Sequence, residues 1–182
     1  MRRSIILNVL WLRAALALGA VAGLSLTALA SSAGSSGTLL ARGGGTTIVH
    51  EGTGKTGGFI PVLTTIAFNA QRAGRVVTGG FECMARAPEA ATGTGSAQFT
   101  VNVMYVTGHI NAATVNGDQA ILTGTATITG LGAGSDVPFT FVVRKGGPGA
   151  SAVLTTEGSP RLVFNEILVE GSFQVFSADS ED

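Results

Sequence analysis

The segment from Leu122 to Thr129 alternates strictly between apolar or small residues and threonine. Successive side chains of a β-strand point to opposite faces, so this period of two predicts a strand with one buried face and one hydroxyl-rich face in water. The segment from Val137 to Val143 repeats the alternation, with two phenylalanines on the face expected inside. After the first thirty residues, no segment keeps an apolar period of 3.6 residues. We therefore predict an all-β domain.

Turn residues divide the chain into about eight such segments. The expected strands lie at residues 46–50, 59–71, 75–87, 98–110, 122–129, 137–143, 150–156 and 161–176. Asn116-Gly117 predicts a type I′ hairpin turn, Gly79-Gly80 predicts a bulge or sharp bend, and Gly171 is expected to interrupt the last strand. Long strands joined in sequence order favour an antiparallel meander that closes into a barrel, with a two-sheet sandwich as the alternative.

The first thirty residues have the organisation of a signal peptide. Positive charge at residues 1–3 precedes an apolar run at 14–29, which is Ala- and Gly-rich and shorter than the roughly 20 residues of a membrane span. Ala28 and Ala30 stand at the two positions that a signal peptidase reads. We expect cleavage near Ser31 and a secreted, periplasmic or cell-envelope protein. The alternative is that the leader is not cleaved, in which case the leader would be the part of the protein that contacts a membrane.

Composition divides the remainder into three parts. Residues 31–58 are rich in glycine and serine and are expected to form a flexible linker, 59–176 a single β domain, and 177–182 an acidic disordered tail. The leader holds three of the eleven basic residues and none of the eleven acidic ones, so eight basic residues and a net charge of −3 remain without it. Because no basic cluster is left, nucleic acid is not an expected partner.

Residues able to carry chemistry are few. Cys83 is the single cysteine, so no intramolecular disulfide is possible. We expect it to be buried on one face of its strand, with an intermolecular disulfide or a reactive thiol as the alternative. His50 and His109 have no metal-ligand spacing, and residues 52–56 (GTGKT) lack the first glycine of a phosphate-binding loop. The sequence therefore predicts no metal and no cofactor.

The last strand places a glutamate among apolar residues. One face carries Phe164, Glu166, Leu168 and Glu170, and the other carries Val163, Asn165, Ile167 and Val169. The favoured interpretation packs the Val and Ile face inward, with Asn165 near a strand end and both glutamates in water. The alternative is an interior carboxylate at Glu166, acting as an acid or ligand anchor in a pocket with Asn165 and Tyr105 as candidate ligand-binding residues. A buried carboxylate would need a partner, because an isolated charge in apolar surroundings is costly.

The alternation from Val115 to Leu131, with Gly80-Phe81-Glu82-Cys83 upstream, resembles small uncharacterised exported bacterial proteins that have a signal peptide, a Gly/Ser linker and one β domain. Over residues 59–176, this resemblance implies a fold type and a location but no activity.

Two hypotheses about function remain. The preferred one is a binding or structural role for a secreted or envelope-associated β domain, in which self-association or a small apolar ligand covers strands that are apolar on both faces. The alternative is a small β-barrel enzyme, similar to an isomerase or cyclase, with Glu166 as the catalytic candidate. The barrel interior discriminates between them, because apolar packing excludes a ligand site there and a polar pocket favours an enzyme or carrier.

Overall fold

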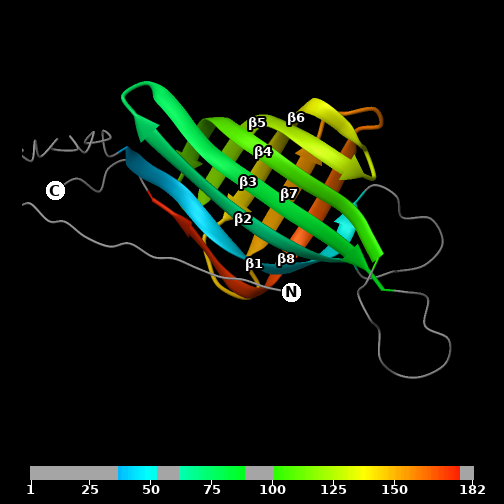
Figure 1. Cartoon of the computed structure of the whole chain (residues 1–182). Helices are drawn as coiled ribbons and strands as arrows, with labels where there is room; N and C mark the ends of the chain where they lie inside the picture. The colour runs from blue at the N-terminus through cyan, green and yellow to red at the C-terminus, as the bar shows by residue number, and fades with distance from the viewer. Residues whose placement is uncertain (1–36, 53–61, 89–100, 177–182) are drawn as a thin grey trace, which may run out of the picture. The chain divides into compact units, whose positions relative to one another are not determined.

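The computed structural model describes residues 37–52, 62–88 and 101–176. They form eight antiparallel strands, each paired with the next along the chain, and β1 pairs with β8 to close a barrel (Figure 1). The strands are β1 (Thr38–Gly52), β2 (Val62–Ala73), β3 (Val76–Ala87), β4 (Val101–Asn116), β5 (Gln119–Gly130), β6 (Gly134–Arg144), β7 (Ser151–Thr156) and β8 (Leu162–Val175). The predicted all-β meander barrel is confirmed, and the sandwich alternative is wrong.

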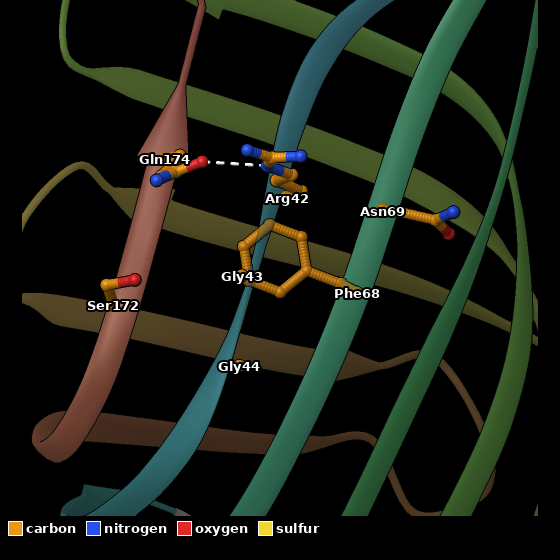
Figure 2. Close-up of a pocket in the computed structure, with 7 residues that line it drawn as sticks. All are labelled: Arg42, Gly43, Gly44, Phe68, Asn69, Ser172 and Gln174. Atoms are coloured by element: carbon orange, nitrogen blue, oxygen red, sulfur yellow. Dashed lines mark hydrogen bonds between the residues drawn. The ribbon is translucent and has the colours of Figure 1, made fainter.

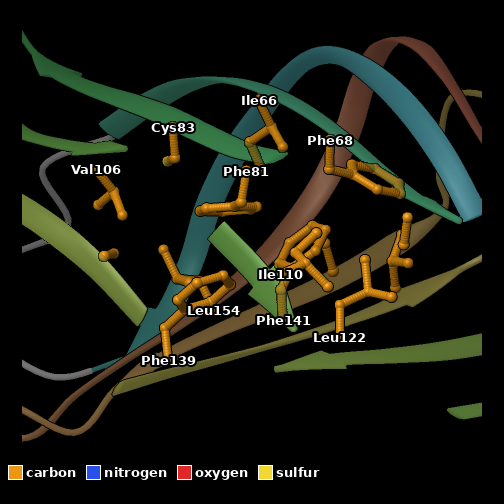
Figure 3. Close-up of a cluster of buried hydrophobic side chains, with 14 of the residues drawn as sticks. Ile66, Phe68, Phe81, Cys83, Val106, Ile110, Leu122, Phe139, Phe141 and Leu154 are labelled. Atoms are coloured by element: carbon orange, nitrogen blue, oxygen red, sulfur yellow. The ribbon is translucent and has the colours of Figure 1, made fainter. Parts of the chain in front are cut away.

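One apolar core fills the barrel (Figure 3). Five phenylalanines that are at most 6% exposed contribute to it: Phe68, Phe81, Phe139, Phe141 and Phe173. The ring of Phe141 lies 5.2 Å from Phe68 and 4.8 Å from Phe81, measured between centroids, and Phe81 lies 5.1 Å from Phe139. These distances are those of packed aromatic pairs. The predicted inward face of β6 is confirmed, since Val137, Phe139, Phe141 and Val143 are all buried.

Strand β5 also confirms its predicted alternation. Leu122, Ala126 and Ile128 are buried, whereas Thr127 and Thr129 are exposed. A strand with one apolar and one hydroxyl-bearing face can lie only with the apolar face toward the core.

The segment predicted as a flexible linker contains the strand that closes the barrel. Residues 38–52 form β1, which pairs with β2 on one side and β8 on the other. The linker prediction for 31–58 and the start of the β domain at 59 are therefore wrong for β1, although the short strand expected at 46–50 lies within it. Ladder hydrogen bonds to two neighbours fix this strand, although it has few large side chains.

Glycines on both strands permit the close approach of β1 and β8. A Cβ atom at Gly45 would lie 1.9 Å from the carbonyl oxygen of Glu170, and one at Gly171 would lie 2.2 Å from the carbonyl oxygen of Gly44. Gly171 also has a φ of 110°, which L-residues with side chains rarely adopt. Glycine at these positions is a requirement of barrel closure, not a sign of flexibility.

Two turn predictions need correction in detail. The β4–β5 turn is centred on Gly117 and Asp118, and Gly117 alone has a positive φ, 56°. One positive φ at the first central residue is the pattern of a type II′ turn, whereas the predicted type I′ turn needs two. The β2–β3 ladder runs through Gly79-Gly80 without a register shift, so the predicted bulge is absent there.

Strand β8 overturns the favoured interpretation of its faces. Glu166 and Leu168 point inward and are 1% exposed, whereas Val169 is 52% exposed. Thr46 and Thr47 of β1 pair with Glu170 and Leu168, which leaves Val169 as an extra residue in a bulge. Beyond this bulge, Phe173 and Val175 are the buried residues. The two halves of β8 therefore turn opposite sets of side chains toward the core, and Glu166 lies inside.

Candidate functional site

Glu166 lies within the barrel beside two threonines. Thr47 of β1 and Thr64 of β2 are both buried, and the hydroxyls of both donate to Glu166 Oε2. The two hydroxyls also contact one another. Glu166 Oε1 is buried and has no hydrogen-bond partner. The carboxylate of Glu166 therefore lies in the interior, as the alternative interpretation of the last strand predicts.

Burial sets the protonation of this cluster. Loss of hydration raises the pKa of Glu166, and the hydrogen bonds from Thr47 and Thr64 lower it by less, so the net direction is upward. Burial also raises the pKa of the Cys83 thiol well above its ordinary value, with a smaller contribution from the Glu166 carboxylate. Both effects favour neutral side chains in the core. The expected burial of Cys83 is confirmed, and its neutral thiol is a poor nucleophile.

The other two candidate ligand residues do not join Glu166. Asn165 alternates with the buried Glu166, so its side chain lies on the outer face, where it is half-buried. Tyr105 lies between the buried Met104 and Val106, and its hydroxyl donates to Glu82 Oε1 on the outer surface. The structure thus separates Glu166 from the pocket partners proposed for it.

A shallow depression lined by polar and apolar residues lies on the outside of the barrel, over β8, β1 and β2 (Figure 2). We call it the outer dish, and its volume is about 420 Å³. Its lining residues are Arg42, Gly43, Gly44, Phe68, Asn69, Ser172 and Gln174.

Strand register builds the outer dish. Arg42 pairs with Asn69 of β2 and with Gln174 of β8, which forms one polar row. Two residues further along β1, Gly44 pairs with Ser172 and with an alanine of β2, which forms a row of small residues. The depression exists because the large side chains of the first row stand beside the small ones of the second.

Hydrogen bonds within the dish orient its polar groups. Arg42 Nε donates to Gln174 Oε1 at 2.7 Å, and the backbone N–H of Gly80 donates to Asn69 Oδ1 at 2.8 Å. The Arg42 guanidinium also lies 5.8 Å from the ring centroid of Phe176, within cation–π range. Each amide oxygen accepts one of these bonds, and the terminal amino groups of Arg42 and the two amide NH₂ groups are donors that no described residue engages.

Sequence reasoning missed the outer dish. Arg42, Gly43 and Gly44 fall in the segment interpreted as a linker, and their partners lie on β2 and on the far end of β8. An arginine before three glycines gave no local signal of a site.

The remaining candidates carry little chemistry. His50 and His109 are both exposed, and the described residues contain no group of three His, Cys, Asp or Glu that could hold a metal ion. Within the same residues there is no helix of the length and apolarity needed to cross a membrane. The leader, with Ala28 and Ala30, and the predicted tail at 177–182 lie outside the described residues.

Comparisons with protein-family models, with curated proteins and with solved structures gave no match to this chain. The fold itself defines the class of protein, which is an eight-stranded antiparallel meander barrel with a packed interior.

Proposed function

We propose that the protein is an exported binding module whose contacts are made on the outside of the barrel. One observation carries this proposal: aromatic and aliphatic side chains fill the interior, whereas the outer dish gathers hydrogen-bond donors that have no partner among the described residues. A ligand inside the barrel would have to displace packed rings. A ligand at the dish needs no rearrangement of the core.

The export part of the proposal is supported by the leader. Its charged start, its short apolar run and the small residues Ala28 and Ala30 are typical of a cleaved signal peptide. Expression of the full chain in a bacterium, followed by fractionation and intact-mass measurement, tests it. We expect a product outside the cytoplasm that begins near Ser31. A cytoplasmic product that retains Met1 would refute export.

The binding part is tested without assuming a ligand class. Native mass spectrometry of the exported protein reports any co-purified molecule and the stoichiometry. Two-dimensional NMR against a mixed set of small acids, sugars and amides then locates any contact. We expect signals of Arg42 and Asn69 to move on binding. The proposal would be refuted if the protein binds no member of the set and co-purifies with no molecule.

Size-exclusion chromatography at high concentration tests the other predicted partner, which is a second copy of the chain. A clean monomer would exclude that partner.

A second function is favoured by one feature, the unpartnered Oε1 of Glu166. A buried neutral carboxyl can act as a general acid, as an isomerase- or cyclase-like enzyme requires, if substrate reaches it. Carbodiimide labelling of the native protein distinguishes the two proposals. Under the binding proposal, the exposed Glu170 is modified and Glu166 is not. Modification of Glu166 at a rate similar to that of Glu170 would instead favour an enzyme with an accessible interior.

A further inference from the structure

We propose that the outer dish binds a carboxylate group, with the Arg42 guanidinium as the main contact and the Asn69 and Gln174 amides as supporting donors. This inference rests on the proposed binding function and names its ligand class.

The first argument is the type of polar group that the dish offers. Gln174 and Asn69 each use their side-chain oxygen in an internal hydrogen bond, which turns their NH₂ groups into the free ends. Arg42 has donors only, and Ser172 adds a hydroxyl. None of the seven lining residues carries a carboxylate. A surface of donors with one cation fits an acceptor-rich anion and fits a neutral sugar less well, because sugar hydroxyls also need acceptors.

The second argument is that Arg42 is held in place without an anionic partner among the residues that the structure describes. Its Nε bonds to Gln174 and its plane lies near the Phe176 ring, which restrains the side chain. The ion pair found among the described residues joins Arg161 to Glu157 on the β7–β8 connection and does not involve Arg42. The two terminal amino groups of Arg42 therefore remain for the parallel hydrogen bonds that a carboxylate accepts.

Two sources can supply such a carboxylate. One is an external acidic molecule. The other is the chain itself, because Asp179, Glu181 and Asp182 follow closely after Phe176, the residue that contacts Arg42. Six residues can extend by about 20 Å, which is sufficient to return to the dish. The chemistry is the same for both sources, and the test separates them.

The probes are D-glucuronate and D-glucose, which share a ring and differ in the carboxylate. We titrate each into the full chain and into a chain that ends at Phe176, and follow the Nε–H of Arg42 and the side-chain NH₂ signals of Asn69 and Gln174. We expect saturable shifts with glucuronate, weakened by added salt, and none with glucose. Shifts in both chains identify an external ligand. If glucuronate shifts the signals only in the shortened chain, and if the shortening itself also changes these signals, then the tail is the occupant of the dish in the full chain.

Gln174→Glu is the sharpest variant. It keeps the oxygen that accepts from Arg42 Nε, so the fold is retained, but it places an anion beside the guanidinium. We expect glucuronate affinity to fall by roughly tenfold or more, which is the scale of one lost charge-assisted hydrogen bond. Arg42→Gln is expected to do the same. Arg144→Gln removes an exposed arginine on β6, outside the dish, and is the charge-matched control that should bind as the unaltered chain does.

Equal shifts with glucose and glucuronate would overturn the carboxylate class while leaving the binding function in place. Glucuronate shifts that are absent from both chains, or that survive Gln174→Glu unchanged, would overturn the site itself. The binding function would then fail only if the mixed ligand set also gave no contact elsewhere.

Discussion

Replacing Glu166 by glutamine tests whether a neutral carboxyl is built into the barrel. Glutamine keeps the shape of the side chain and an oxygen to accept from Thr47 and Thr64, but it cannot ionise. The carboxyl is 1% exposed, and burial raises its pKa, so the folded state holds its proton more tightly than the unfolded state does. The stabilisation from that proton is complete below the unfolded pKa and is lost as pH rises toward the folded pKa.

The size of the effect follows from one proton. Between the unfolded value, near 4.5, and the raised folded value, the free energy of unfolding should fall by up to about 1.4 kcal/mol for each pH unit. Glu166→Gln removes this slope and leaves the contributions of all other groups in place. The new NH₂ group will occupy the position of the unpartnered Oε1, at a cost of about 1–3 kcal/mol that does not depend on pH.

Urea unfolding of both proteins from pH 4 to pH 9 measures the difference. The difference between the two free energies should shift in favour of the variant as pH rises, and level off above the folded pKa of Glu166. Glu170→Gln, an exposed change on the same strand, should follow the unaltered protein. Curves for Glu166→Gln and the unaltered protein that stay parallel across this range would refute a protonated core carboxyl.

Three further outcomes are expected. Gly45→Ala should destabilise the barrel by about 2–4 kcal/mol in urea unfolding, because its Cβ would lie 1.9 Å from the Glu170 carbonyl oxygen. The control Gly74→Ala has open space around it and should cost about 1–2 kcal/mol from its positive φ alone. Equal costs for the two variants would contradict the close β1–β8 contact. Phe141→Ala should cost about 3–5 kcal/mol by the same measurement, since the ring is fully buried, and a loss below about 1 kcal/mol would argue against a packed interior. Cys83 should react with a disulfide reagent at pH 8 roughly a hundredfold more slowly in the folded than in the unfolded protein, because burial raises its pKa and blocks access, and similar rates would contradict that burial.

The alternating strands were predictable because their signal is local. In β5 and β6 the apolar residues recur every second position, and both strands bury the faces that this period indicates. Each side chain there has the same environment as its neighbour two residues away. A short window of sequence is therefore enough to assign the face.

Strand β1 and the Glu166 cluster were not predictable in this way. Gly43-Gly44-Gly45 has the composition of a linker, and it is a strand because it pairs with β2 on one side and with β8, more than a hundred residues away, on the other. The direction of Glu166 depends on the bulge at Val169, where the inward face of β8 changes from even to odd positions. The prediction compared the two faces of residues 163–170 and placed the Val and Ile face inward, which was wrong because Glu166 and Leu168 are buried.

The sequence by itself determined most of the strand-forming segments after β1, the inward phenylalanines of β6 and the preference for a meander, because a two-residue period and short turns act between near neighbours. Only the tertiary structure decided that β1 closes the barrel, that Glu166 lies inside it, and that Arg42, Asn69 and Gln174 meet on its surface. These features depend on the register between the first and last strands. That register is set where backbones can approach closely and where one extra residue shifts the pairing.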